Sequence, residues 1–185
     1  MSNFWTRDFF KKCVALEVYG TYKQQKRLSL IDKVYCKFFK PETNSVYLIR
    51  KYLFLANKKS RFSKARSRMI ASKLIWKYGI SIQPHCLIDL GLRIIHPSNI
   101  MICNVKIGKN LTLYQNVTIG TKHFGYKKDE YAEIGDNVTF YSNSGCFGTI
   151  KITNDVTIGC FSSVFHDIVE PGVYFGLASN LKRKE

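Results

Sequence analysis

The stretch that decides the fold is EIGDNVTFYSNSGCFGTIKITNDVTIGCFSSVFHDIV, residues 133–169. An apolar residue recurs in it at every sixth position, and a small or branched residue stands four positions after each. The first set is Ile134, Phe140, Cys146, Ile152, Ile158 and Val164, and the second is Val138, Ser144, Ile150, Val156, Ser162 and Ile168. A strand alternates with a period of two and a helix with a period of about 3.6, so neither explains a period of six.

The same period continues upstream of this stretch. It passes through Ile107, Leu113 and Ile119, and before them through Ile82, Ile88, Ile94 and Ile100, with one residue gained between Ile100 and Ile107. A parallel β-helix explains it, because each hexapeptide supplies one short strand and one turn, and three hexapeptides complete a triangular coil. We therefore predict a mainly β fold, a parallel β-helix of about five coils. The longer interruption TKHFGYKKDEY, residues 121–131, is expected to protrude as a loop.

The first part of the chain is helical in its pattern. Apolar residues at three-to-four spacing predict helices over residues 6–19, 28–39, 45–57 and 62–79, the last of them stopped by Gly79. The segment KPETNS, residues 40–45, is expected to be a break, with Pro41 ending one helix and Asn44 or Ser45 capping the next. We expect a helical region over 1–79, a β-helix domain over 80–180 and a basic tail over 181–185.

The positive charge is concentrated in the helical region. Residues 1–79 hold nineteen Lys and Arg against four Asp and Glu, whereas residues 80–185 hold ten against nine. One interpretation is a solvated basic face over an apolar stripe; another is attraction to an anionic polymer or to the anionic inner surface of a membrane, with KKSRFSKARSR, residues 58–68, as the densest run. Nucleic-acid binding is not favoured, because no helix-turn-helix or RNA-binding signature accompanies the charge.

Composition also indicates where in the cell the protein resides. No apolar run approaches the roughly 20 residues that span a bilayer, and the opening MSNFWTRDFF lacks the features of a signal peptide. The six cysteines include no C-x-x-C pair, so we expect reduced thiols acting as small hydrophobic residues and no metal site. These features predict a cytoplasmic protein. Peripheral contact with the inner membrane is an additional interpretation.

The order of the segments resembles one enzyme family. SIQPHCLI opens the repeats, IIHPSNIMI carries one histidine, KIGKNLTLYQNVTIGTK precedes the loop, EIGDNV restarts the coils and YFGLASNLKRKE closes them. This order is similar to the hexapeptide-repeat acyltransferases with a left-handed β-helix, in their serine acetyltransferase branch, which includes capsule and exopolysaccharide O-acetyltransferases. The resemblance implies a homotrimer with active sites between neighbouring prisms, and acetyl-CoA as the co-substrate.

The resemblance also implies roles for single residues. His96 matches the general base, which takes the proton of an acceptor hydroxyl as that hydroxyl attacks the thioester. Without the repeats, His96 would be interpreted as a structural histidine. The residues implied to contact the cofactor are Gly120 and Thr121 at the pantetheine, Ser142, Gly159 and Ser162 at positions of close approach, and Lys182 and Arg183 at the nucleotide phosphates. For Lys182 and Arg183, a solvated terminus is an equal alternative.

Two positions depart from the family pattern. Ser81 stands where the family has an aspartate that supports the base, and Tyr131 stands where it has a substrate-contacting histidine. Asp89 is an alternative residue for orienting His96, and His123 in the loop either contacts the acceptor or is merely exposed.

These departures favour a saccharide hydroxyl as the acceptor, in a capsular polysaccharide, an exopolysaccharide or a sialic-acid-type sugar. The alternatives are O-acetylation of L-serine for cysteine biosynthesis, and a non-enzymatic β-helix scaffold that binds an anionic polymer or a membrane. Ser81, Tyr131 and His123 are the substrate-binding candidates in either enzymatic interpretation.

Overall fold

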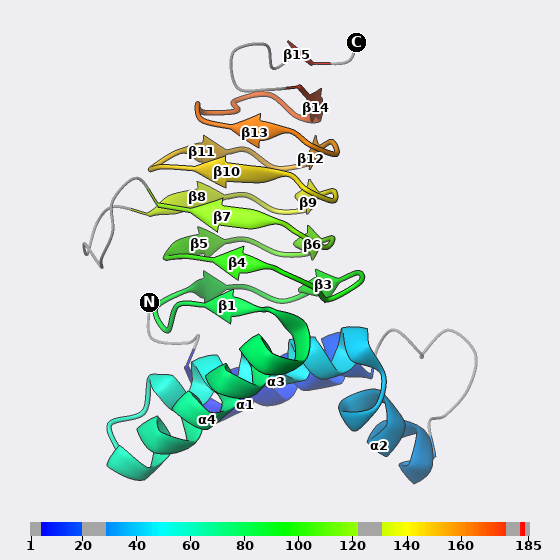
Figure 1. The fold of residues 1–185 in the computed structure, drawn as a ribbon, viewed down its shortest axis with the longest axis vertical. Helices are drawn as coiled ribbons and strands as arrows, with labels where there is room; N and C mark the ends of the chain where they lie inside the picture. Colours follow the sequence, from blue (N-terminus) through cyan, green and yellow to red (C-terminus); the bar gives the residue numbers. More distant parts are fainter. Residues whose placement is uncertain (1–4, 20–28, 122–130, 177–181, 184–185) are drawn as a thin grey trace.

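The chain forms a triangular stack of short strands that stands on a layer of helices (Figure 1). This computed structural model describes residues 5–19, 29–121, 131–176 and 182–183. His123 lies outside the described residues, as do the side chains of Lys182 and Arg183, so the predictions made for these three side chains are not addressed by the structure.

The helical layer comes first in the chain. Its elements are α1 (Arg7–Cys13), the π-helical turn η1 (Val14–Val18), α2 (Leu30–Phe38), α3 (Pro41–Ala56) and α4 (Arg61–Tyr78). Side chains cap two of them: Thr6 accepts from the backbone N–H of Phe9, and Ser29 and Asp32 form a reciprocal capping box. Helix α4 ends at Gly79, whose φ of 65° is the left-handed conformation that glycine adopts without strain. No helix in the described ranges is long and apolar enough to cross a bilayer.

The predicted break at residues 40–45 is wrong. Helix α3 begins at Pro41, so Asn44 and Ser45 lie inside the helix and do not cap it. Proline is tolerated as the first residue of a helix, because the N–H that it lacks has no partner there anyway. The proline therefore starts the helix, and only Phe39 and Lys40 separate α2 from α3.

From Ser81 onwards the strands build three parallel sheets, which are the three sides of the prism. Sheet A contains β1 (Ser81–Ile82), β4 (Met101–Ile102), β7 (Thr118–Gly120), β10 (Gly145–Phe147) and β13 (Ser163–Val164). Sheet B contains β2 (Leu87–Ile88), β5 (Val105–Ile107), β8 (Ala132–Ile134) and β11 (Lys151–Ile152). Sheet C contains β3 (Arg93–Ile94), β6 (Thr112–Leu113), β9 (Thr139–Phe140), β12 (Val156–Ile158), β14 (Gly172–Phe175) and the antiparallel β15 (Lys182–Arg183).

The six-residue period becomes the core of the prism. On sheet B, Ile88 pairs with Ile107, Ile107 with Ile134 and Ile134 with Ile152, so equivalent side chains stack along the axis. All four are buried. Stacking removes each aliphatic side chain from water, which contributes roughly 1.5–3 kcal/mol per side chain. The predicted β-helix with preceding helices is confirmed.

Asparagines turn the chain at the corners between sheets. Asn110, Asn137 and Asp155 lie above one another at the corner between sheets B and C, with φ values of 58–59°. Asparagine and aspartate enter this left-handed region more readily than other side chains. The amide of Asn110 donates to Asn137 Oδ1 at 2.8 Å, and that of Asn137 donates to Asp155 Oδ1 at 2.8 Å. The corner is thus held by a ladder of side-chain hydrogen bonds.

A buried ion pair joins the helical layer to the first coil. Arg50 of α3 binds Glu17 of η1 through two nitrogen atoms, one at 2.8 Å. Arg50 also donates to the carbonyl of Asp89 at 2.6 Å, and Glu17 accepts from the N–H groups of Gly91 and Leu92 at 2.9 and 3.0 Å. Burial disfavours the charged guanidinium, but the Glu17 carboxylate raises the pKa of Arg50 above its ordinary value. The pair supplies hydrogen bonds that a preceding coil would otherwise provide.

Candidate active site

The corner between sheets C and A differs from its neighbour in the next coil by two residues. Ile94 pairs with Leu113 and Met101 pairs with Thr118, so six residues between these pairs in the first coil face four in the second. The N–H of Ile95 donates to the carbonyl of Leu113, and Ser98 accepts from the N–H of Asn116. These bonds bracket the two extra residues, which are His96 and Pro97.

This insertion corrects the predicted register. Ile100 was assigned to the same column as Ile94, but the pairing of Met101 with Thr118 aligns Ile100 with Val117. Ile102 takes the place in the stacked column instead, opposite Ile119. Only five positions then separate Ile102 from Ile107. The gain of two residues and the later loss of one leave the net gain of one that the sequence displays.

The insertion turns His96 outwards. Its φ of 54° is a left-handed conformation that non-glycine residues seldom adopt, and its side chain is exposed. No hydrogen bond to the ring is present among the residues that the structure describes. Residues held in such a sparsely populated conformation cluster at functional sites. An exposed imidazole on a rigid corner is available to a substrate, which a core histidine would not be.

From His96 towards the last coils, the same corner carries small and aromatic side chains. Ser142 Oγ lies 3.4 Å from Cys160 Sγ, and the rings of Tyr114 and Tyr141 stack with their centroids 4.7 Å apart. Gln115 occupies the layer next to Ser98, and its Oε1 is buried without a hydrogen-bond partner among the described residues. A buried acceptor without a donor calls for a water molecule or a ligand. Sequence reasoning missed Gln115, because only the pairing places it next to the inserted corner.

Two of the cofactor candidates, Gly120 and Thr121, do not share this corner. Gly120 ends β7 at the opposite side of sheet A and Thr121 follows it; a Cβ on Gly120 would approach Phe147 Cδ1 to 2.9 Å. Gly159 lies against β14, and its Cβ would meet that of Phe175 at 3.0 Å. Ser162 is fully buried, and its Oγ accepts from the N–H of Gly176. Gly159 and Ser162 lie between β12 and β13, on the same corner as His96 and Ser142, and both also make packing contacts with the strand that follows.

The substrate candidates are also separated in one subunit. Ser81 is exposed in β1 and pairs with Met101, the first residue of the strand that follows the His96 corner. Tyr131 is half-buried and precedes β8 at the start of sheet B. Asp89 follows β2 at the corner between sheets B and C, and its carboxylate accepts from the N–H of Leu90. It is therefore at a different corner from His96 and does not orient that ring.

No cysteine has a chemical role in the candidate site. The described cysteines are all free, and Cys86 and Cys146 are buried. Burial raises the pKa of each of these two thiols to about 12, which keeps them protonated and unreactive. Cys160 is exposed, which differs from the prediction of small hydrophobic residues.

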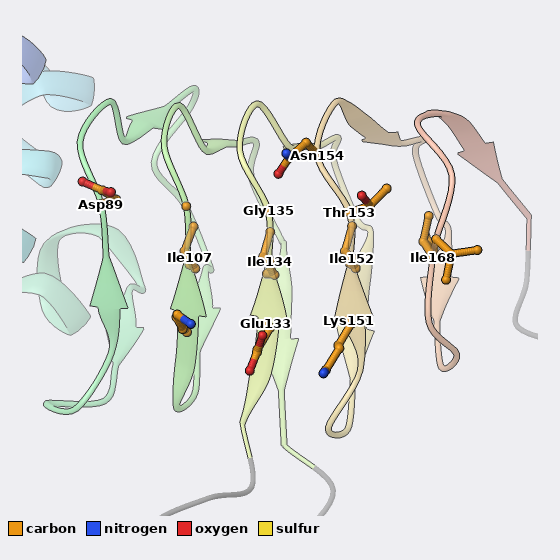
Figure 2. Close-up of a pocket in the computed structure, with 13 residues that line it drawn as sticks. Asp89, Ile107, Glu133, Ile134, Gly135, Lys151, Ile152, Thr153, Asn154 and Ile168 are labelled. Atoms are coloured by element: carbon orange, nitrogen blue, oxygen red, sulfur yellow. The ribbon is translucent and has the colours of Figure 1, made fainter. Parts of the chain in front are cut away.

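A groove of about 510 Å³ runs along sheet B towards its corner with sheet C (Figure 2). Gly108 and Gly135 hollow it out, because a Cβ at either position would collide with the side chain of Asp136 or Asn154. Its charged side chains are Asp89, Lys106, Glu133 and Lys151. It contains no histidine or cysteine, and His96 lies at another corner. We therefore place the candidate chemistry at the His96 corner and not in this groove.

Comparison with known proteins yields the same fold. The gonococcal serine acetyltransferase structure superposes with a TM-score of 0.76 over 97% of this chain and 68% of its own, at 19% identity. A serine acetyltransferase in complex with CoA superposes with a TM-score of 0.73 over 96% of this chain and 71% of its own, at 15% identity. The chain therefore has the left-handed β-helix fold of these structures. The predicted fold class is thereby confirmed.

The sequence relatives are also serine acetyltransferases, which confirms the predicted resemblance to that branch. The serine acetyltransferase of Staphylococcus epidermidis is 33% identical over 121 residues, which are 64% of this chain and 56% of the relative. That of Staphylococcus aureus is 32% identical over 111 residues, 58% of this chain and 50% of the relative. The chain thus spans about half the length of the curated relatives it matches. No family model matches the sequence.

These comparisons overturn the predicted saccharide acceptor. The relatives and the solved structures above are serine acetyltransferases, so they favour the alternative acceptor and give no support to capsule or exopolysaccharide modification. The prediction rested on Ser81 and Tyr131 in place of an aspartate and a histidine. Both replacements supply a hydroxyl, which donates and accepts hydrogen bonds. The two departures therefore do not by themselves exclude a small polar acceptor.

Proposed function

We propose that this protein transfers the acetyl group of acetyl-CoA to the side-chain hydroxyl of L-serine, with His96 as the general base. The observation that carries the proposal is the two-residue insertion that turns His96 out of the prism. Two further findings support it: the similarity in sequence to two staphylococcal serine acetyltransferases, and the shared fold with a serine acetyltransferase that binds CoA.

The proposed reaction needs one proton acceptor. The neutral imidazole of His96 takes the proton from the serine hydroxyl as the oxygen attacks the thioester carbonyl. The tetrahedral intermediate carries an oxyanion, which hydrogen-bond donors stabilise. Its collapse breaks the C–S bond and expels the CoA thiolate, which takes the proton back from the imidazolium. Histidine suits this role, since its ordinary pKa lies close to neutral pH. No acyl-enzyme forms, and no cysteine is required.

The acetyl-CoA substrate would lie along the same corner, from His96 towards the last coils. Ser142 and Cys160 present small side chains there, so the pantetheine chain can approach the backbone. The unpartnered Gln115 Oε1 offers an acceptor to an amide N–H of the pantetheine or to the ammonium group of serine. Ser81, in the strand beside β4, is the residue proposed to hold serine or the His96 ring by a neutral hydrogen bond.

We further propose that three copies assemble and share each site. In one subunit Tyr131, Gly120 and Thr121 lie at the other edge of sheet A from His96, so they cannot meet the same substrate there. A neighbouring copy that presents this edge to the His96 corner would complete the site. Trimerisation thus explains why the predicted residues are separated along one prism.

The experiment is an acceptor assay. The full chain is incubated with acetyl-CoA and L-serine, free thiol is followed, and the product is identified by mass spectrometry. We expect thiol release that depends on L-serine, together with O-acetylserine. A background rate that serine does not raise, or a serine that gains no acetyl group, contradicts the proposed acceptor. Sedimentation analysis of the same preparation tests the trimer separately.

A further inference from the structure

Helix α2 presents its apolar face to solvent. Its described side chains are all at least partly exposed except Cys36, which is buried against the protein. At 100° per residue, the centre of the apolar arc lies on the side of the helix away from Cys36. The large apolar side chains of this face and of the residue after it are 43–79% exposed; they are Leu30, Ile31, Val34, Tyr35, Phe38 and Phe39. A contiguous apolar face of this kind marks an interaction surface.

Helix α4 is strongly basic. It carries six basic residues, and no acidic residue occurs anywhere between Glu42 and Asp89. Phe62, Met69 and Trp76 follow one another at seven-residue spacing and are 71–89% exposed. Seven residues bring a helix back to nearly the same side, so these three side chains form one stripe among the cations. Aromatic and basic side chains on one helix suit the boundary between lipid headgroups and acyl chains.

Both helices belong to the same end of the molecule. The amide nitrogen of Asn44 donates to the carbonyl of Lys37 in α2 at 2.6 Å, and Asn44 Oδ1 accepts from the Tyr78 hydroxyl of α4 at 2.7 Å. The C-terminal ends of α2 and α4 are therefore fixed to one residue of α3. Figure 1 shows both helices at the end of the prism opposite to the last coils.

We propose that this end docks onto an anionic lipid bilayer, with the α2 face in the headgroup region and the α4 cations on lipid phosphates. Residues 29–78 contain thirteen Lys and Arg against two acidic residues, a balance that favours an anionic partner and opposes a second copy of the same surface. The apolar face of α2 opposes a nucleic acid, since a phosphate backbone offers it no apolar surface. The inference concerns location and does not depend on the acetyl acceptor.

The test is flotation of the full chain with vesicles. Three vesicle or salt conditions are compared: neutral phosphatidylcholine, the same lipid with 30 mol% phosphatidylglycerol, and the anionic vesicles in 0.5 M salt. We expect binding to the anionic vesicles at least ten-fold above the neutral ones, and a marked loss in salt. Two variants, Ile31→Gln/Phe39→Gln and Arg61→Gln/Lys64→Gln/Arg68→Gln, should each weaken binding several-fold. The matched control Lys106→Gln/Lys109→Gln/Lys151→Gln removes three cations from the β-helix and should bind like the parent.

Several results would overturn the proposal. Absence of flotation with anionic vesicles does so directly, and so does equal binding by the parent and by both variants. If Ile31→Gln/Phe39→Gln instead lowers the oligomeric mass in solution without lipid, a second copy covers α2. If the α4 variant loses affinity for single-stranded nucleic acid while vesicle binding is absent in the parent, the partner is a nucleic acid. Circular dichroism and thiol release with L-serine show whether each variant is folded.

Discussion

Glu17 and Arg50 form a salt bridge that is sealed between the helices and the first coil, with Glu17 Oε1 also accepting from Gly91 and Leu92. The two residues are 33 positions apart, and the first backbone group that Arg50 binds in the β-helix, the carbonyl of Ile88, lies 38 positions after it. The helical layer is thus built into the β-helix as its first cap. A β-helix without such a cap would leave the backbone groups of its first coil unpaired.

We expect Glu17→Gln to destabilise the fold by about 3–5 kcal/mol, because it leaves a buried guanidinium without its counter-charge. Urea denaturation followed by circular dichroism measures the change. The control is Glu42→Gln, which removes a half-exposed carboxylate from the first turn of α3 and should cost less than about 1 kcal/mol. If the two variants lose the same free energy of unfolding, the buried Glu17–Arg50 pair contributes no more to stability than an exposed carboxylate does.

A second prediction concerns the inserted corner. Deletion of His96 and Pro97 together leaves four residues between the paired residues, the number that the next coil already has. We expect the shortened chain to fold, with a melting temperature within about 2–4 °C of the parent, which corresponds to roughly 1 kcal/mol for a chain of this size. It should have no acetyl transfer. A deletion variant that fails to fold would show that the insertion serves packing.

The sequence alone predicted the six-residue repeats, but it did not predict the two-residue insertion at the His96 corner. The column from Ile134 to Val164 is regular, because each of these side chains meets the same environment in successive coils. The inserted His96 and Pro97 were hidden, since the missing residue between Ile102 and Ile107 partly cancels them and Ile100 falls in phase by accident. Only pairing between coils, a long-range property, separates an insertion of two from a gain of one.

The candidate site was predicted only through the family resemblance, which nominated His96 together with the small residues Ser142, Gly159 and Ser162; pairing between coils places all four on one corner. For Gly159 and Ser162 the structure also offers a packing reason for their size, since β14 packs on the first and Gly176 donates a hydrogen bond to the second. A small residue in a hexad has two explanations, close approach of a ligand or close approach of the next strand. The sequence alone does not distinguish them.

Gln115 provides the third prediction. Gln115→Met keeps the size of the side chain but removes the buried acceptor Oε1. Because that acceptor has no partner among the described residues, its removal should leave the free energy of unfolding within about 1 kcal/mol of the parent. If it binds the substrate, KM for acetyl-CoA or for serine should rise several-fold. An unchanged KM for both would assign the polar group no part in binding.

A fourth prediction follows from the buried thiols. The pKa of Cys146 is raised from 9.0 to about 12 by burial, so the unfolded chain loses this proton before the folded chain does. Stability is therefore undiminished below about pH 9 and falls as the pH rises towards 12, with a slope of about 1.4 kcal/mol per pH unit for each such thiol. Cys146→Ala should reduce the slope measured by urea denaturation between pH 9 and 10.5.

The control for that experiment is Ile152→Val. It should lower stability by about 0.5–1.5 kcal/mol at every pH through lost packing, and it should leave the slope unchanged. Cys146→Ala and Ile152→Val with the same slope would contradict the role of the buried thiol.

The most direct test of the account is the turnover of His96→Ala, measured as thiol release from acetyl-CoA with saturating L-serine. Its matched control is His166→Ala, which removes another exposed histidine that belongs to no proposed site. Loss of a general base costs typically 10²–10⁴-fold, so we expect a fall of that size for His96→Ala and parental turnover for His166→Ala. A folded His96→Ala variant that acetylates serine as fast as the parent would contradict the central claim.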